Sequence, residues 1–347
     1  MPKTTPMKRL LLSVSILTLC FTPAFSQRSF EMGISGGVSN YFGDLGNESW
    51  FQTSSSQPGA AITFRNFLGS SAYSGNLYRP LSVEVRLSWN RLQYDEVKPI
   101  GGRTGWELRN YGRGIGFRND LFGTAVHVTY TLYSNARLPL HKQHAAFFVF
   151  TGIGAYYGKP KADLFRGEID IKNRYYIWSD GTVRDAPDEG MGSSGNIIEK
   201  DGEYETNLAD WFTEGDNYQG EASKKSTYNF INTGIPMGVG IRYGISKKLT
   251  LSTEFGYYMF FTDFIDDVSD QYPTYAEVNA NFPNDPVKQA LAIYISDPTG
   301  FGNSGYPSPA TSPRGNPGKK DAHSYINLEL AYKFEFRKGI PKLWGRR

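Results

Sequence analysis

The sequence predicts an all-β fold, an eight-stranded antiparallel transmembrane β-barrel with long extracellular loops. Eight segments alternate apolar and polar residues with a period of two, and they are long enough to cross a bilayer at a tilt. The connections between them are alternately short and long, as in barrels with short turns on one side of the membrane and long loops on the other. Tyrosine and phenylalanine gather at the ends of the segments, as they do at a headgroup boundary.

The eight strands follow from this alternation. The clearest, residues 81–92, has Leu81, Val83 and Val85 on one face and polar side chains on the other. Residues 145–157 are apolar on both faces, so the pattern does not orient that strand. Pro236 removes a ladder hydrogen bond within its strand, and we expect a bulge or kink there. The expected strands are residues 30–42, 60–67, 81–92, 122–132, 145–157, 228–243, 249–261 and 326–336.

The connections set the topology. If the chain enters from the periplasm, residues 68–80, 133–144 and 244–248 are periplasmic turns. The expected extracellular loops are residues 43–59, 93–121, 158–227 and 262–323. The barrel then occupies residues 27–337, and a short basic tail at 338–347 lies in the periplasm. The last loop contains a predicted helix over residues 287–295, with Pro286 in its first turn and Asn284 or Asp285 as its cap.

The first 26 residues have the composition of an export signal. Basic residues open the segment, an apolar core spans residues 10–21, and small residues precede Gln27. Cys20 lies inside the apolar core, and bulky Leu19 before it argues against lipid attachment at this cysteine. We therefore expect a cysteine-free mature chain in the outer membrane, in contact with its lipid.

Composition excludes several other classes of protein. Aromatic residues make up 15% of the 347 residues, too many for a disordered chain. A single cysteine cannot form a disulfide framework or a thiolate-ligated zinc site. The 37 basic and 34 acidic residues are spread along the chain, so nothing indicates nucleic acid as a partner. We also expect no cofactor.

The interior of an eight-stranded barrel is just wide enough for side chains to fill it, so we do not expect solute transport. Opposite charges in so narrow a lumen pair with each other, because an unpaired buried charge is costly. We expect a charge network that plugs and stiffens the barrel rather than a path for ions or protons. The charges assigned to the inner face are Glu31, Arg65, Glu84, Arg86, Arg242, Glu254, Glu329 and Lys333.

Candidate catalytic residues are few. Some lipid-modifying barrels use a histidine with a nearby serine or glutamate, and His127 with Thr129 on the same face is the nearest equivalent here. His141, His144 and His323 are scattered along the chain. We therefore assign no catalytic residue, and a lipid-modifying enzyme is the least favoured hypothesis.

An acidic segment follows the seventh strand at residues 262–270. Its four carboxylates could bind calcium, but the segment lacks the glycine and the regular spacing of an EF-hand loop. Aspartate and serine also cap turns at strand ends. We favour turn capping and assign no metal.

Two segments resemble a known family. The sequence YFGDL at residues 41–45, together with FTDFIDDVS at residues 261–269 and the following Tyr272, resembles the signature segments of a Bacteroidetes family of outer-membrane β-barrels. That family includes PorG of the type IX secretion and gliding system. The signature residues, to which we assign no role, are Tyr41, Gly43, Asp44, Leu45, Thr262, Asp263, Asp266, Asp267 and Ser269.

The resemblance covers the mature chain and implies a non-enzymatic barrel that associates with the periplasmic ring proteins PorK and PorN. Loops 158–227 and 262–323 are long and individual, so the chain is either the secretion component or a paralogue. A surface barrel whose long loops bind a ligand or adhere is the alternative hypothesis.

The topology separates the signature segments from the ring partner. Both segments follow odd-numbered strands, so we expect them together at the extracellular rim, whereas the ring is periplasmic. Basic periplasmic turns and the basic tail are better candidates for contact with an acidic ring partner. These candidates are Arg137, His141, Lys142, Lys247, Lys248, Lys338, Lys342, Arg346 and Arg347.

Overall fold

The computed structural model describes residues 29–46, 53–68, 80–97, 112–135, 138, 140–143, 145–178, 180–190, 192, 194–214, 230–300, 302 and 313–335. The expected export signal and basic tail lie outside these ranges. Within them, no helix has the length and apolar character needed to cross a membrane.

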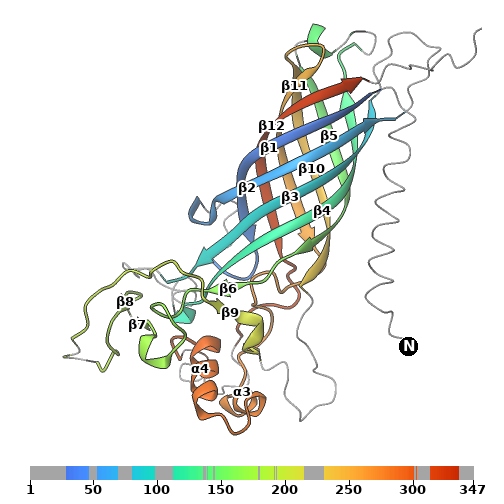
Figure 1. Cartoon of the computed structure of the whole chain (residues 1–347). Coiled ribbons are helices and arrows are strands. Elements are labelled where there is room, and N and C mark those ends of the chain that lie inside the picture. Colours follow the sequence, from blue (N-terminus) through green and yellow to red (C-terminus); the bar gives the residue numbers. More distant parts are fainter. Residues whose placement is uncertain are drawn as a thin grey trace, which may run out of the picture.

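Eight long strands form a closed antiparallel barrel (Figure 1). In chain order they are β1 (Ser29–Phe42), β2 (Gln57–Phe67), β3 (Leu81–Asp95), β4 (Gly116–Leu132), β5 (Ala146–Tyr157), β10 (Ile231–Gly244), β11 (Leu249–Phe260) and β12 (Ala322–Glu335). Each strand pairs with the next of this set, and β1 pairs with β12 to close the barrel. The predicted fold class is confirmed.

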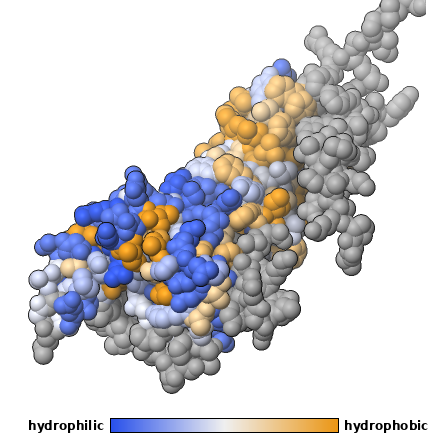
Figure 2. Space-filling model, turned by 60° about the horizontal axis from the view of Figure 1, so that its bottom comes forward, coloured by the Kyte–Doolittle hydropathy of each residue, from blue (hydrophilic) through white to orange (hydrophobic). Residues whose placement is uncertain are grey.

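The outer face of the barrel is apolar and its inner face is polar. Ile34 and Ile153, for example, expose 60% and 61% of their surface on the outside, whereas charged side chains of the same sheet are buried inside. Figure 2 shows the apolar surface over the barrel, beyond a mainly hydrophilic lobe. A soluble barrel would place its apolar side chains inside, and this reversed arrangement is the one that lipid requires. The protein is an outer-membrane barrel.

Strands β3 and β4 continue further from the membrane than predicted. Tyr94 pairs with Phe117 in residues assigned to the 93–121 loop. At the start of this extension Arg91, at the end of the predicted strand, forms an ion pair of 2.9 Å on the outer face with Asp120 from the predicted loop, while Leu92 is fully buried on the inner face. The alternation therefore continues, but outward-facing positions become polar once the strand has left the lipid. Strands β2 and β12 also begin earlier than the loop boundaries at 59 and 323 predict.

The register around Pro236 excludes the inserted residue of a bulge, one of the two distortions expected there. Gly234 pairs with Gly154 of β5 and Met237 pairs with Thr151, so the register is unchanged and no residue is inserted. The pairing with β5 is interrupted between these two rungs, while the pairing with β11 is continuous. The missing N–H of Pro236 thus weakens one ladder without shifting it.

Glycines of β10 decide the orientation of β5, which the sequence pattern did not resolve. Phe148 and Phe150 point into the lumen, and their rings lie over Gly240 and Gly238. A Cβ atom at either glycine would collide with the facing ring. The large and small residues fit together only with the phenylalanines turned inward.

The loops at one end of the barrel fold into an extracellular lobe, made of the described residues of 158–214 and 261–321 (Figure 1). Its short strands and helices are β6 (Lys161–Ala162), β7 (Tyr176–Ile177), β8 (Val183–Arg184), β9 (Thr206–Asn207), η3 (Ile171–Asn173), η4 (Leu208–Asp210), α3 (Tyr275–Asn281) and α4 (Pro286–Ser296). Elsewhere, η1 (Thr53–Ser55) precedes β2 and η2 (Leu140–Lys142) lies in a periplasmic turn.

Helix α4 agrees with the predicted helix. Asp285 is its N-cap and accepts a hydrogen bond from the backbone N–H of Lys288 at 3.0 Å. Helix α3 was not predicted, since its seven residues carry too little periodicity, although Thr274 and Glu277 form a capping box at its start. Tyr294 on α4 donates to the carbonyl of Leu164 at 3.0 Å and fixes the helix against the rest of the lobe.

Candidate functional site

The lumen holds a network of ion pairs centred on Arg65 of β2. Its Nε lies 2.7 Å from Oε1 of Glu84, its Nη1 3.2 Å from Oε2 of Glu31, and its Nη2 2.9 Å from Oε1 of Glu329. All four side chains are buried. One guanidinium therefore links four different strands, because its planar fork presents donors in several directions.

Glu84 on β3 extends the network to the other side of the barrel. Its Oε1 accepts from Nη2 of Arg242 at 2.9 Å and from the hydroxyl of Thr129 at 2.8 Å. Arg86 lies 3.7 Å from the other oxygen of Glu84 and binds Glu254 through two hydrogen bonds of 2.5 and 2.8 Å.

The eight charges assigned to the lumen thus lie close together. Lys333 is opposite Glu31 in the pairing of β1 with β12 and is half-buried near the periplasmic end. Four positive and four negative groups balance, and their contacts join facing walls of the barrel. Such an arrangement fills the lumen and holds the strands together.

His127 on β4 lies in this lumen without the partners that catalysis needs. Its ring stacks on Phe150 with the ring centroids 4.9 Å apart, and neither ring nitrogen has a hydrogen-bond partner. The hydroxyl of Thr129 donates to Glu84 instead. Among the described residues, no group forms a hydrogen bond that would orient the imidazole or receive its proton.

The two segments that carry the family resemblance meet at the extracellular mouth of the barrel. The hydroxyl of Tyr41 donates to the carboxylate of Asp266 and accepts from the backbone N–H of Leu45. At Gly43 a Cβ atom would collide with the Tyr41 hydroxyl and with Oδ1 of Asp321, so only glycine fits there. We call this group the mouth cluster, and its members are Tyr41, Gly43, Asp44, Leu45, Asp263, Asp266, Asp267, Ser269, Arg314 and Asp321.

Arg314 connects the acidic segment to the rest of the mouth cluster. It donates to the backbone carbonyl of Asp267, and its Nη2 lies 3.4 Å from Oδ2 of the same residue. Its Nη1 lies 3.1 Å from Oε1 of Glu214, which also accepts from the backbone N–H of Ser269 at 2.7 Å. Asp267 has a φ of 68°, a strained backbone conformation for a residue other than glycine, which these contacts hold in place.

A second arginine, Arg113, brings in the loop after β3. It forms a buried ion pair with Glu96 and donates to the backbone carbonyls of Arg314 at 2.5 Å and Asp44 at 3.0 Å. Asn119 of β4 donates to the carbonyl of Ile265 at 2.8 Å. All four extracellular connections therefore meet at the mouth cluster.

The structure brings most of the signature residues together and adds residues that the sequence pattern missed. Thr262 lies at the edge, where its carbonyl accepts from the backbone N–H of Asp321 at 3.2 Å. The acidic segment uses its oxygens on protein donors, for example Oδ2 of Asp263 with the hydroxyl of Ser269 at 2.9 Å. The missed residues, Glu96, Arg113, Glu214, Arg314 and Asp321, come from three loops with no spacing that relates them.

Burial and like charge raise the pKa values of the mouth-cluster carboxyls. Burial, with Asp44 and Asp263 nearby, holds the pKa of Asp266 well above its usual range. The pKa of Asp321 is raised in the same way by burial and by the facing Asp266. Burial and Asp44 also raise the pKa of Asp263 to about 7, against the hydrogen bond from Ser269. The folded mouth therefore favours the protonated form of these three carboxyls.

We expect the stability of the extracellular lobe to fall as the pH rises. Below about pH 4 the carboxyls are protonated in both states, and above it the unfolded chain ionises while the folded mouth resists, so the free energy of unfolding decreases until the folded pKa is passed. Asp321→Asn removes one such group and keeps an acceptor for Ile265. It should raise the free energy of unfolding by at least about 1.4 kcal/mol near pH 8 and change it little near pH 4.

Urea unfolding followed by tryptophan emission at the two pH values measures this effect. Asp270→Asn, which removes an exposed carboxylate of the same segment, is the control and should show no such difference. A wild-type pH dependence in Asp321→Asn would show that other groups cause it.

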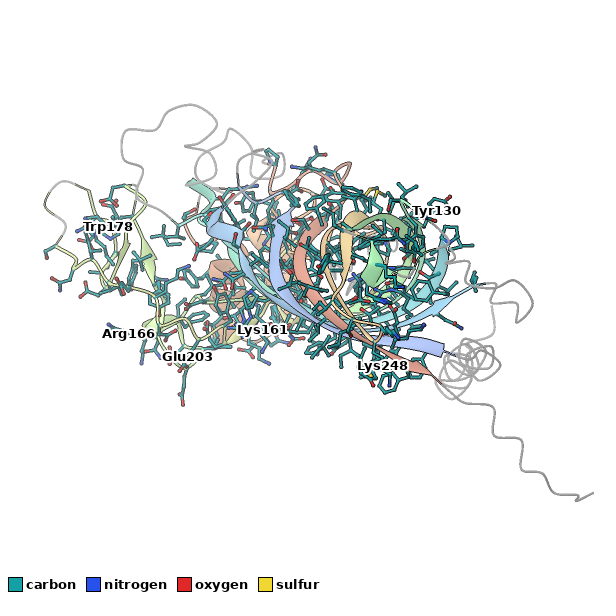
Figure 3. The ribbon with its side chains drawn as sticks, turned by 90° about the horizontal axis from the view of Figure 1, so that it is seen from above. Tyr130, Lys161, Arg166, Trp178, Glu203 and Lys248 are labelled. Atoms are coloured by element: carbon teal, nitrogen blue, oxygen red, sulfur yellow. The ribbon has the colours of Figure 1, made fainter. Side chains whose placement is uncertain are left out.

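Four of the nine basic residues predicted to contact the ring lie in the described part of the periplasmic turns. Lys142, Lys247 and Lys248 are exposed and His141 is half-buried. Figure 3, which looks onto the barrel from above, shows Lys248 at this rim. The other five candidates, Arg137, Lys338, Lys342, Arg346 and Arg347, lie outside the described residues.

No protein-family model and no curated protein matches the chain. Among solved structures it is similar to the attachment invasion locus protein Ail of Yersinia pestis, with 6% identity, a TM-score of 0.31, and coverage of 88% of this chain and 98% of Ail. It is also similar to Neisserial surface protein A, with 7% identity, a TM-score of 0.32, and coverage of 89% of this chain and 100% of that protein. A major outer membrane protein of Thermus thermophilus is similar too, with 11% identity, a TM-score of 0.35, and coverage of 88% of this chain and 99% of that protein. At such low identities and TM-scores the likeness gives no information about function.

Proposed function

We propose that this barrel is a non-enzymatic, PorG-like component of a type IX secretion system that anchors periplasmic ring proteins of the PorK and PorN type to the outer membrane. The observation that carries the proposal is the mouth cluster. Most of the signature residues are buried contact residues of this fold, and Tyr41, Asp266 and Gly43 take part in one arrangement. The resemblance thus concerns residues that join the extracellular loops at the mouth of the barrel.

The periplasmic turns supply a surface for the ring. Three exposed lysines, Lys142, Lys247 and Lys248, lie at this end, and a positive surface of this kind attracts an acidic partner. The lumen is filled by its ion pairs, which supports an anchoring role rather than transport.

A gentle detergent pull-down of a loop-tagged barrel from its native membrane tests the proposal. Ring proteins should co-purify, and glutamate at positions 142, 247 and 248 should release them. Glutamate at Lys172 and Lys288, two exposed lysines of the extracellular lobe, is the matched control and should have no effect. Normal export of type IX cargo in a deletion strain, or a pull-down without ring proteins, contradicts the proposal.

The second candidate function is binding of a ligand or surface by the extracellular lobe. Ile197 and Val287 each expose 66% of their surface there, and Figure 2 shows apolar patches within the hydrophilic lobe. If this function holds, serine at both positions abolishes binding of the barrel to its target, whereas the lysine changes at the periplasmic turns leave it intact. A lipid-modifying activity would instead be lost in His127→Ala, and we expect unchanged lipids in that variant.

A further inference from the structure

Three carboxylates converge in the extracellular lobe, away from the mouth cluster. One carboxylate oxygen each of Asp163, Asp201 and Glu205 lies within 4.8 Å of the other two. Asp163 directly follows β6 and Glu205 directly precedes β9, and these two short strands pair antiparallel, which places the two side chains next to each other. Figure 3 shows this part of the lobe around the labelled Lys161, Arg166 and Glu203.

Within the part of the chain that the structure describes, two buried oxygens at this point have no hydrogen-bond partner. Asp163 is only 5% exposed, and while its Oδ2 accepts from the backbone N–H of Gly202 at 2.9 Å, its Oδ1 accepts from no protein group. Oε2 of Glu205 is likewise buried and unpartnered. A buried charged oxygen without a donor is costly, so its place in a native fold indicates a ligand that supplies positive charge.

Backbone N–H groups hold all three carboxylates in place. Oε1 of Glu205 accepts from the backbone N–H groups of Leu164 and Phe165 at 3.0 and 3.1 Å. The two oxygens of Asp201 accept from the N–H groups of Gly167 and Glu203, each at 2.9 Å. These hydrogen bonds fix the direction of each carboxylate without neutralising it.

Lys200, whose charge acts on Asp163, forms its ion pair elsewhere. Nζ of Lys200 lies 2.8 Å from Oδ2 of Asp95, on the extension of β3. Burial raises the pKa of Asp163 to about 6; Lys200 opposes the shift, and the carboxylates of Asp201 and Glu205 add to it. The three acidic groups therefore repel one another, and a cation between them would relieve this repulsion.

We propose that Asp163, Asp201 and Glu205 bind one calcium ion in the extracellular lobe. The ligands are all hard oxygens and come from two irregular segments rather than a rigid cage. Such a site suits the flexible coordination of calcium better than the near-ideal octahedron that magnesium demands, and water can supply the remaining ligands. The ion would tie residues 163–167 to residues 201–205 at the base of the lobe.

Calorimetric titration of the folded full-length barrel in detergent with calcium chloride tests the proposal. We expect one saturable site with a Kd of about 10⁻⁴–10⁻³ M, the range of extracellular calcium modules. Asp163→Asn and Glu205→Gln should each weaken binding at least about tenfold. Glu168→Gln removes an exposed carboxylate of the same segment and Asp263→Asn alters the mouth cluster, and both should bind as the wild type does.

Two further results make the test decisive. Heat-modifiable migration of each variant shows that its barrel is folded, and calcium should slow proteolysis between residues 163 and 205 in the wild type but not in Asp163→Asn. No heat of binding up to about 10 mM calcium, or equal binding by the wild type and both site variants, would overturn the proposal. Loss of binding in Asp263→Asn alone would do the same, because it would place the ion at the mouth.

Discussion

Replacing Glu84 by glutamine is expected to lower the free energy of unfolding of the barrel by about 3–5 kcal/mol. Glu84 is almost fully buried and contacts Arg65, Arg86 and Arg242. The amide fills the same space but carries no charge, so three buried guanidinium groups lose their shared counter-charge. Urea unfolding in detergent, followed by the heat-modifiable shift in migration, measures the change.

The matched control is Asp120→Asn. Asp120 also contacts two arginines, Arg91 at 2.9 Å and Arg118 at 3.2 Å, but it lies on the outer surface beyond the lipid and is 28% exposed. Solvent screens such a pair, so the loss should be about 1 kcal/mol or less. Equal losses in the two variants would show that the lumen network does not stabilise the barrel more than a surface pair does.

The strands could be predicted from sequence because lipid and lumen impose opposite demands on alternate residues. Each transmembrane strand therefore alternates apolar and polar residues within its own sequence, as residues 81–92 do. The rule fails where the outer face of a strand no longer contacts lipid. Strands β3 and β4 therefore continue into the residues predicted as the 93–121 loop, and the ion pair of Arg91 with Asp120 lies on the outer face near this boundary. The rule also leaves β5 without an orientation, because that depends on Gly238 and Gly240 of another strand.

The charges of the lumen were predictable as a set but not as pairs. Alternation places Arg65 and Glu84 on the inner face, whereas the choice of partners depends on the barrel closing and bringing β2, β3, β10 and β12 around one space. The mouth cluster shows the same limit more strongly. Arg113 and Arg314 are 201 positions apart, and nothing local relates them.

The lumen and the mouth therefore stabilise different parts of the molecule. Ion pairs in the lumen join the strands to one another, while the mouth cluster joins the four extracellular connections to the top of the barrel. A lesion in the first should weaken the whole barrel. A lesion in the second should release the loops and leave the barrel folded.

Arg314→Met is the variant that distinguishes the contribution of the mouth cluster from that of the lumen network. Arg314 is almost fully buried, and its loss leaves the carboxylates of Asp267 and Glu214 without their counter-charge. We expect opening of the mouth to become easier by about 3–5 kcal/mol, which is more than about a hundredfold in the population of the open form. Hydrogen exchange and limited proteolysis of residues 261–270 should rise accordingly, while heat-modifiable migration of the barrel stays unchanged.

Lys320→Met provides the comparison. Lys320 is exposed, and within the described residues its Nζ donates a hydrogen bond only to the carbonyl of Pro317. In Lys320→Met, hydrogen exchange and proteolysis of residues 261–270 should be as slow as in the wild type. If Arg314→Met also behaved as the wild type, the other contacts of the mouth, such as those of Tyr41, Asp321 and Arg113, would be enough to hold it closed. If it unfolded the barrel, the loops and the strands would form one cooperative unit, because release of the mouth would then remove support that the lumen network cannot replace.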